Sequence, residues 1–181
     1  KGLHEFFHNM MHSAYFGQGV NVKLIEIKPG KIIDEEKFTV EAFLLNHSVP
    51  CFGFTLKEKD KRKINIEYTS KFGLKQHPIL GELQKGKSIV WEGKKITPEK
   101  ATTIVKGKKV GIIWDTGVCN NCVKIAKDAD LVISESTFSV KERDKAKAYK
   151  HLTTEDAAKI AKKAKAKRLI LTHFRQRYKD V

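Results

Sequence analysis

An apolar run that ends in polar side chains decides the fold: residues 129–138 have the sequence ADLVISESTF. Its central residues, Leu131 to Ile133, favour a buried β-strand, and Glu135 follows directly. Two other runs have the same form, because residues 110–114 lead into Asp115 and residues 168–171 lead into His173. Helical segments separate these strands, so the pattern predicts an α/β layered sheet.

Candidate functional residues lie where these strands end. Open α/β sheets build their sites at the carboxyl ends of their strands, and Asp115, Glu135 and His173 occupy such ends. His47 and His151 lie in polar breaks elsewhere. Imidazole and carboxylate groups suit zinc, so His47, Asp115, His151 and His173 are candidates for a metal site. The residues alone leave open whether the histidines bind metal or are structural.

The flanking sequence predicts smaller elements. We expect a helix at residues 3–14 and strands at 20–24, 38–44 and 52–56. Residues 57–108 combine charge, Gly, Pro and short apolar pieces, which indicates loops with small elements. Thr153 or Thr154 can cap a helix over residues 155–164, because a hydroxyl there accepts hydrogen bonds from unpaired N–H groups.

The composition limits the class of protein. The 181 residues suit one domain, and 36 Lys+Arg against 21 Asp+Glu give a net charge of +15. This charge favours a polyanion such as RNA or DNA as partner, although a Lys-rich proteome of a heat-loving organism is an alternative. Apolar runs are far shorter than the ~20 residues of a membrane span. Three cysteines are too few for a disulfide scaffold and suit a reducing cytosol.

The chain ends suggest a piece of a longer protein. The sequence starts at Lys1 without an initiator Met and stops at Val181 shortly after a dense motif. We therefore expect a single domain over residues 1–181 that is incomplete at both ends.

Two local motifs offer other functions. His4-Glu5-Phe6-Phe7-His8 matches the H-E-x-x-H pattern of zinc proteases, although a plain amphipathic helix with a polar edge gives the same spacing. Cys119 and Cys122 form a C-x-x-C pair. A structural zinc site needs four ligands and only Cys51 remains, so the alternatives are a redox role or two small residues at a helix start.

Taken together, five motifs resemble those of ribonuclease Z, the tRNA 3′-processing endonuclease of the metallo-β-lactamase fold. In order, they are residues 46–54 (NHSVPCFGF), Asp115-Thr116, residues 129–138, residues 151–158 (HLTTEDAA), and residues 169–174 (LILTHF) with Arg177 and Tyr178.

The resemblance implies a specific site and activity. The fold would be an α/β (α+β) αββα sandwich, present here as a C-terminal portion. His47, Asp115 and His173 would be metal ligands, with Asp115 bridging two zinc ions. Glu135 and His151 would handle protons while a phosphodiester bond after the discriminator nucleotide of precursor tRNA is hydrolysed, which removes the 3′ trailer. The resemblance further implies a cytoplasmic homodimer with no membrane association.

The sequence also departs from the family. The upstream His-x-His-x-Asp-His zinc box and the arm that grips the tRNA elbow are absent, and Trp114 stands where the family usually has Gly. We therefore expect the chain alone to be inactive. The rival functions are a noncatalytic RNA-binding subunit, a lactamase-fold hydrolase of small molecules, which the positive charge disfavours, and the H-E-x-x-H zinc protease.

Overall fold

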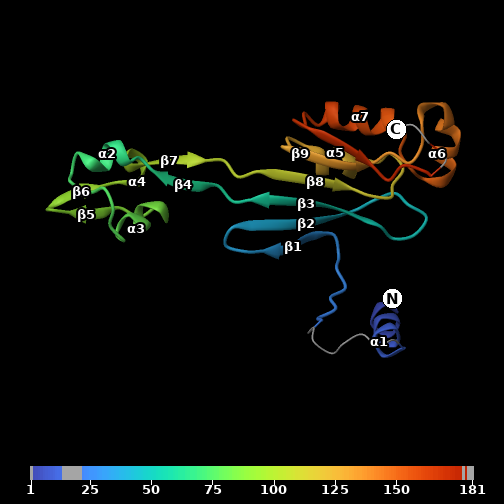
Figure 1. Ribbon diagram of the computed structural model, residues 1–181, viewed down its shortest axis with the longest axis horizontal. Helices are drawn as coiled ribbons and strands as arrows, with labels where there is room; N and C mark the ends of the chain where they lie inside the picture. Colours follow the sequence, from blue (N-terminus) through green and yellow to red (C-terminus); the bar gives the residue numbers. More distant parts are fainter. Residues whose placement is uncertain (1, 14–21, 177, 179–181) are drawn as a thin grey trace.

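A six-stranded mixed sheet forms the centre of the protein (Figure 1). The computed structural model describes residues 2–13, 22–176 and 178. The strand order is β1-β2-β3-β8-β9-β10; the first four strands pair antiparallel, and β8, β9 and β10 pair parallel. The strands are β1 (Gly30–Asp34), β2 (Phe38–Leu44), β3 (Phe52–Glu58), β8 (Lys109–Ile113), β9 (Leu131–Glu135) and β10 (Leu169–Thr172).

Two helices, α5 (Asn120–Ala126) and α7 (Thr154–Lys163), cover one face of this sheet (Figure 1). Ile125 of α5 and Ile160 of α7 pack with Val132 of β9 in one buried apolar cluster. Thr153 caps α7: its hydroxyl accepts from the Asp156 N–H, and the Asp156 carboxylate accepts from the Thr153 N–H in return. The predicted cap is therefore confirmed at Thr153.

The opposite face of the sheet is also apolar. Three pairings link apolar residues across four strands: Phe54 with Ile112, Ile112 with Ile133, and Ile133 with Ile170. These side chains therefore form one row. They alternate with the residues that contact α5 and α7 and do not join that cluster. Ile170 is 50% exposed. In the described part of the chain, α5 and α7 thus cover one face of the six-stranded sheet, and the row through Ile170 lies on the other face.

A separate module projects from the sheet between β3 and β8 (Figure 1). Strands β4 (Lys61–Ile64) and β7 (Thr102–Val105) pair at its base. Beyond them lie α2 (Ile66–Ser70), α3 (Leu80–Gln84), β5 (Ile89–Trp91), β6 (Lys94–Ile96) and α4 (Pro98–Ala101). Its buried residues form a second apolar cluster: Leu74, Leu80, Leu83, Ile89, Ile96 and Ala101. The sequence indicated small elements in this region, but not their common core.

The remaining elements agree with the sequence in part. The first helix, α1 (Leu3–Ser13), forms as expected, while residue 14 lies outside the described part. Residues 22–24 are not a strand, so the strand predicted at residues 20–24 is wrong in the part that the structure describes. Strand β1 was not predicted. A 3₁₀ turn (Val140–Glu142) leads into α6 (Arg143–Tyr149). Every described helix is too short or too polar to cross a membrane.

Gly111 permits the close packing of α5 on the sheet. A Cβ atom at this position would lie 2.9 Å from the Ile125 carbonyl oxygen and 3.0 Å from its Cγ2 atom. We predict that Gly111→Ala lowers the free energy of unfolding by about 1–3 kcal/mol, the usual cost of overpacking, as measured by urea denaturation.

Gly81 is the matched control, because a Cβ atom there meets nothing within 4 Å and the residue lies in α3. Gly81→Ala should be neutral or stabilise by up to about 1 kcal/mol, since Ala favours helix. Equal effects at the two positions would contradict the packing role of Gly111.

Candidate metal centre

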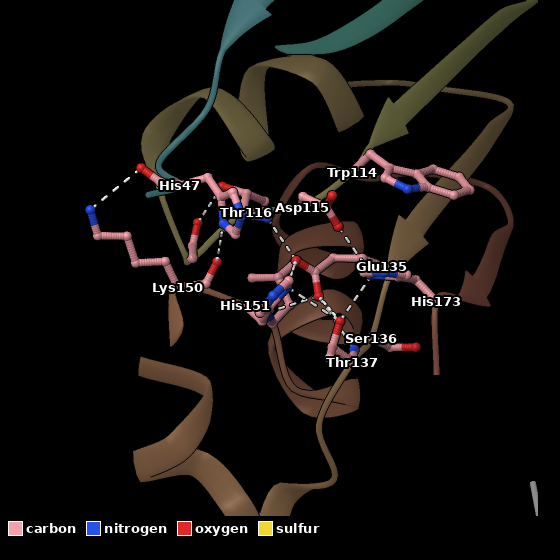
Figure 2. Close-up of polar contacts among 12 residues, drawn as sticks. His47, Trp114, Asp115, Thr116, Glu135, Ser136, Thr137, Lys150, His151 and His173 are labelled. Atoms are coloured by element: carbon pink, nitrogen blue, oxygen red, sulfur yellow. Dashed lines mark hydrogen bonds and ion pairs between the residues drawn. The ribbon is translucent and has the colours of Figure 1, made fainter. Parts of the chain in front are cut away.

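Four polar side chains meet at the carboxyl edge of the parallel strands (Figure 2). Asp115 follows β8, Glu135 ends β9 and His173 follows β10. Because β8, β9 and β10 are parallel, these three ends share one edge, as the sequence pattern predicted. His151 joins them from the loop before α7, and its Nδ1 atom lies 2.9 Å from Glu135 Oε1.

His47 approaches from the turn after β2. Its ring centroid lies 5.1 Å from that of His151, and the His151 ring lies 5.7 Å from that of His173. The turn is held in place by the backbone, since the Gly117 N–H donates to the Asn46 carbonyl at 2.9 Å. All five candidate residues therefore lie in one region.

Glu135 is fully buried and accepts five hydrogen bonds. Oε1 accepts from the Thr116 N–H at 2.6 Å and contacts the His151 imidazole. Oε2 accepts from the Thr137 hydroxyl at 2.7 Å, the Leu152 N–H at 3.2 Å and the Thr137 N–H at 3.3 Å. This many donors compensates a buried negative charge, so Glu135 is held as a carboxylate whose position is fixed by three loops.

The hydrogen bonds determine the tautomer of each histidine. His47 Nδ1 lies 3.2 Å from the Lys150 carbonyl, which only accepts, so His47 carries its proton on Nδ1. His151 Nδ1 likewise donates to the Glu135 carboxylate. The Thr137 hydroxyl gives its proton to Glu135, so its oxygen accepts from His173 Nδ1 at 3.0 Å. Each imidazole is left with a free lone pair on Nε2, the form that binds a metal.

Asp115 provides the test of whether this site fits a cation. Its Oδ1 atom is buried without a hydrogen-bond partner in the described residues, although His173 Nδ1 lies 3.2 Å away as an ion-pair contact. The Nδ1 proton of His173 is directed to the Thr137 hydroxyl, so it does not satisfy Asp115 Oδ1. An unpaired buried carboxylate oxygen beside imidazoles is the arrangement that a divalent metal satisfies. The residues therefore fit a metal.

The closest group of possible ligands differs from the set that the resemblance implied. Asp115, His151 and His173 each offer an atom within 4.8 Å of the others. His151 thus belongs to this group by distance, whereas His47 does not, although its ring lies 5.1 Å from that of His151. His4 and His8, by contrast, are exposed on α1 and belong to no such group among the described residues.

Three of the six described non-Gly residues with a positive φ lie at the site. Asp115 and His173 have φ values of 43° and 58°, and Lys150, which precedes His151, has 55°. Side chains other than Gly adopt this left-handed region at a cost and concentrate there at functional sites. Asp and His adopt this region more often than most residues other than Gly, but residue type alone does not show which Asp or His will do so.

Trp114 and Cys51 lie next to the candidate metal ligands. The Trp114 indole is 40% exposed and its centroid lies 6.2 Å from the His173 ring. The Cys51 thiol donates to the Trp114 carbonyl at 3.2 Å. Burial, reinforced by the charge of Asp115, raises the pKa of Cys51 above its usual value, so this thiol stays protonated.

The residue that sequence reasoning missed is Thr137. Its hydroxyl contacts Glu135, His151 and His173, so it links three of the five candidate residues. Its sequence signals were its place in the motif of residues 129–138 and its position two residues after the end of β9. Thr116 was noted as part of a motif, but its N–H donation to Glu135 could not be read from the sequence.

Comparisons with known proteins give relatives for the whole chain. Ribonuclease Z of Geobacillus kaustophilus is 35% identical over 98% of this chain and 59% of its own length. Zinc phosphodiesterase ELAC protein 1 of Homo sapiens is 41% identical over 83% of this chain and 43% of its own. The chain thus spans about half the length of these relatives, 59% of one and 43% of the other. No protein-family model matches it.

Solved structures give similar relatives. Human tRNase Z, short form, gives a TM-score of 0.51 with 31% identity over 81% of this chain and 39% of that one. The metallo-β-lactamase fold protein YhfI from Bacillus subtilis also gives 0.51, with 19% identity over 83% of this chain and 42% of that one. The α/β fold is therefore that of the metallo-β-lactamase proteins.

The donors around Glu135 generate a stability prediction. Glu135→Gln keeps the shape but places an NH₂ group against N–H or O–H donors. We expect the free energy of unfolding to fall by about 3 kcal/mol, because a buried charge-assisted network is broken. Urea denaturation measures it, with Glu36→Gln as the exposed control, expected within about 0.5 kcal/mol of the parent. An equally small change in the free energy of unfolding for Glu135→Gln would contradict the stabilising role of the hydrogen bonds to Glu135.

Proposed function

We propose, from the premise that this chain is a relative of ribonuclease Z with the metallo-β-lactamase fold, that it forms part of a zinc-dependent endoribonuclease. The proposed reaction hydrolyses precursor tRNA after the discriminator nucleotide and removes the 3′ trailer. The observation that carries the proposal is the group of imidazoles with free Nε2 atoms around the unpaired carboxylate oxygen of Asp115.

In this proposal His47, Asp115 and His173 would hold two zinc ions, and Asp115 would be the ligand common to both. Zinc supplies Lewis-acid catalysis, since it acidifies a water molecule and offsets the charge of the phosphate. Support comes from the ligand types, from the fixed tautomers and from the name of the zinc phosphodiesterase relative. Three ligands are too few for two four-coordinate zinc ions, so the remaining ligands have to come from the rest of the protein.

This count makes the 181-residue chain inactive by itself in our proposal. The apolar row through Phe54, Ile112 and Ile170 supports the same conclusion, because the second sheet of the sandwich would cover it. The remainder of the protein would thus complete both the core and the site.

We assign acid catalysis to Glu135 and His151. The Glu135 carboxylate holds His151 by Nδ1, so the Nε2 atom is the one that can carry a proton towards the site. A proton delivered from Nε2 to the departing ribose 3′-oxygen would leave a 3′-hydroxyl on the tRNA. Glu135 would stabilise the charged imidazole before transfer and keep its ring oriented afterwards. The competing role for His151 is a metal ligand, because it lies within ligand distance of Asp115 and His173.

The charge of the protein supports an RNA substrate. The projecting module from Lys59 to Lys108 carries 13 Lys and Arg residues against five Asp and Glu, in a chain with a net charge of +15. Such a surface attracts a phosphate backbone without reading its sequence. A hydrolase of small molecules has no need for this charge, and a noncatalytic RNA-binding subunit has no need for the buried Glu135 network. The cytoplasmic location and the homodimer stay predictions.

Asp115→Ala tests the metal assignment. We predict about two zinc ions per chain in the complete protein and a loss of at least one in the variant, because the bridging carboxylate is removed. Elemental analysis measures this, and Asp144→Ala, at an exposed position of α6, is the control. Unchanged zinc content in the Asp115 variant would exclude it as the bridging ligand.

His151→Ala separates catalysis from coordination. In the complete protein we predict that single-turnover cleavage of a 3′-extended tRNA falls by about 10² to 10⁴, the usual contribution of positioned acid catalysis, while zinc content is unchanged. Zinc loss would make His151 a ligand, and normal cleavage would make it structural. The double variant His4→Ala/His8→Ala is the control, and loss of its zinc would instead favour the protease alternative.

A further inference from the structure

Two cysteines that the proposed function does not use lie in contact at the start of α5. The Sγ atoms of Cys119 and Cys122 are 3.4 Å apart. Cys122 is fully buried in the apolar cluster under the sheet, whereas Cys119 is partly exposed. Cys119 is therefore the more exposed of the two residues, and it is the one that a small reagent would meet first.

The surrounding backbone holds the pair in this position. The Cys122 N–H donates to the Cys119 carbonyl at 3.1 Å, which closes the turn between them. The Thr116 hydroxyl lies 4.0 Å from Cys119 Sγ. Since Thr116 also donates its N–H to Glu135, the thiol pair adjoins the loop that carries Asp115.

The pair has unequal acidity. The hydrogen bond from Cys122, with the N–H groups of Cys122 and Asn121, lowers the pKa of Cys119 to about 5. The same hydrogen bond and burial raise the pKa of Cys122. At neutral pH the accessible Cys119 is thus the thiolate and the buried Cys122 is the thiol that donates to it.

A metal does not explain this arrangement. A closed zinc site takes four ligands, and among the described residues no third His, Asp, Glu or Cys joins the two sulfurs in a ligand group. Cys51, the remaining cysteine, instead donates to the Trp114 carbonyl.

We propose that Cys119 and Cys122 form a redox-active pair that a low-molecular-weight disulfide converts reversibly into an intramolecular disulfide. The Cys119 thiolate attacks one sulfur of oxidised glutathione and expels a glutathione thiolate. Cys122 then loses its proton, attacks Cys119 Sγ and expels the second glutathione. Two protein thiols are oxidised, one glutathione disulfide is reduced to two thiols, and excess reduced glutathione reverses both steps.

Thiol mapping of the complete native protein tests the proposal. The protein is incubated with oxidised glutathione, free thiols are alkylated, and the peptides are identified by mass spectrometry. We expect the peptide that contains Cys119 and Cys122 to lose two hydrogens and to regain them with dithiothreitol, while Cys51 is alkylated throughout. Two alkylated cysteines at 119 and 122, or a stable glutathione adduct on Cys119, would overturn it.

Single substitutions give matched controls. Cys51→Ser should form the same linkage as the parent protein. Cys119→Ser should leave Cys122 unmodified by glutathione under native conditions, because its sulfur is buried. Modification of Cys122 in that variant at the parental rate would show that Cys119 is not the entry point and would overturn the order of steps. If Cys119→Ser does not fold, thiol mapping of the parent protein still tests whether the disulfide between Cys119 and Cys122 forms.

The pH dependence of alkylation is a further test. Because the hydrogen bond from Cys122 lowers the pKa of Cys119, its rate with iodoacetamide should rise much less steeply between pH 7 and 9 than that of an ordinary thiol. The raised pKa of Cys51 predicts a rate that rises about tenfold per pH unit over that interval. The same rise at Cys119 would identify an ordinary thiol and overturn its role as the attacking group.

Discussion

Glu135 carries a carboxylate with no exposure to solvent, and five donors from three loops point at its two oxygens. A buried charge of this kind is costly unless every lone pair is used, so the loops after β8 and β9 and the loop before α7 have to close around it together. Through the Thr137 hydroxyl the same network reaches His173 after β10. The orientation of the histidines is thus a consequence of how one carboxylate is solvated by the protein.

The parallel arrangement of β8, β9 and β10 makes this network possible. Parallel strands bring their carboxyl ends to one edge, and the sequence showed these ends as apolar runs that stop at Asp115, Glu135 and His173. That part of the site could be predicted because the period of the strands and the position of their ends are local properties. The Thr153 cap could be predicted for the same reason.

The rest depends on contacts between distant segments. The role of Thr137 needs the positions of three other side chains, and the left-handed backbone of Asp115 and His173 is imposed by the folded protein rather than by residue type. The module core, likewise, arises from isolated apolar residues such as Leu74 and Ile96 that show no period along the chain. Strand β1 was missed because its only large apolar residues, Ile32 and Ile33, are adjacent and show no alternation.

The base of the projecting module is narrow. Its chain leaves the sheet after Glu58 and returns at Lys108, and these two residues are joined by a backbone hydrogen bond of 2.8 Å. Because departure and return coincide, and the module has its own apolar cluster, a change in its length or contour leaves the strand ends at the site where they are. The sequence of the module can consequently vary without disturbing the arrangement of Asp115, Glu135 and His173 at the strand ends.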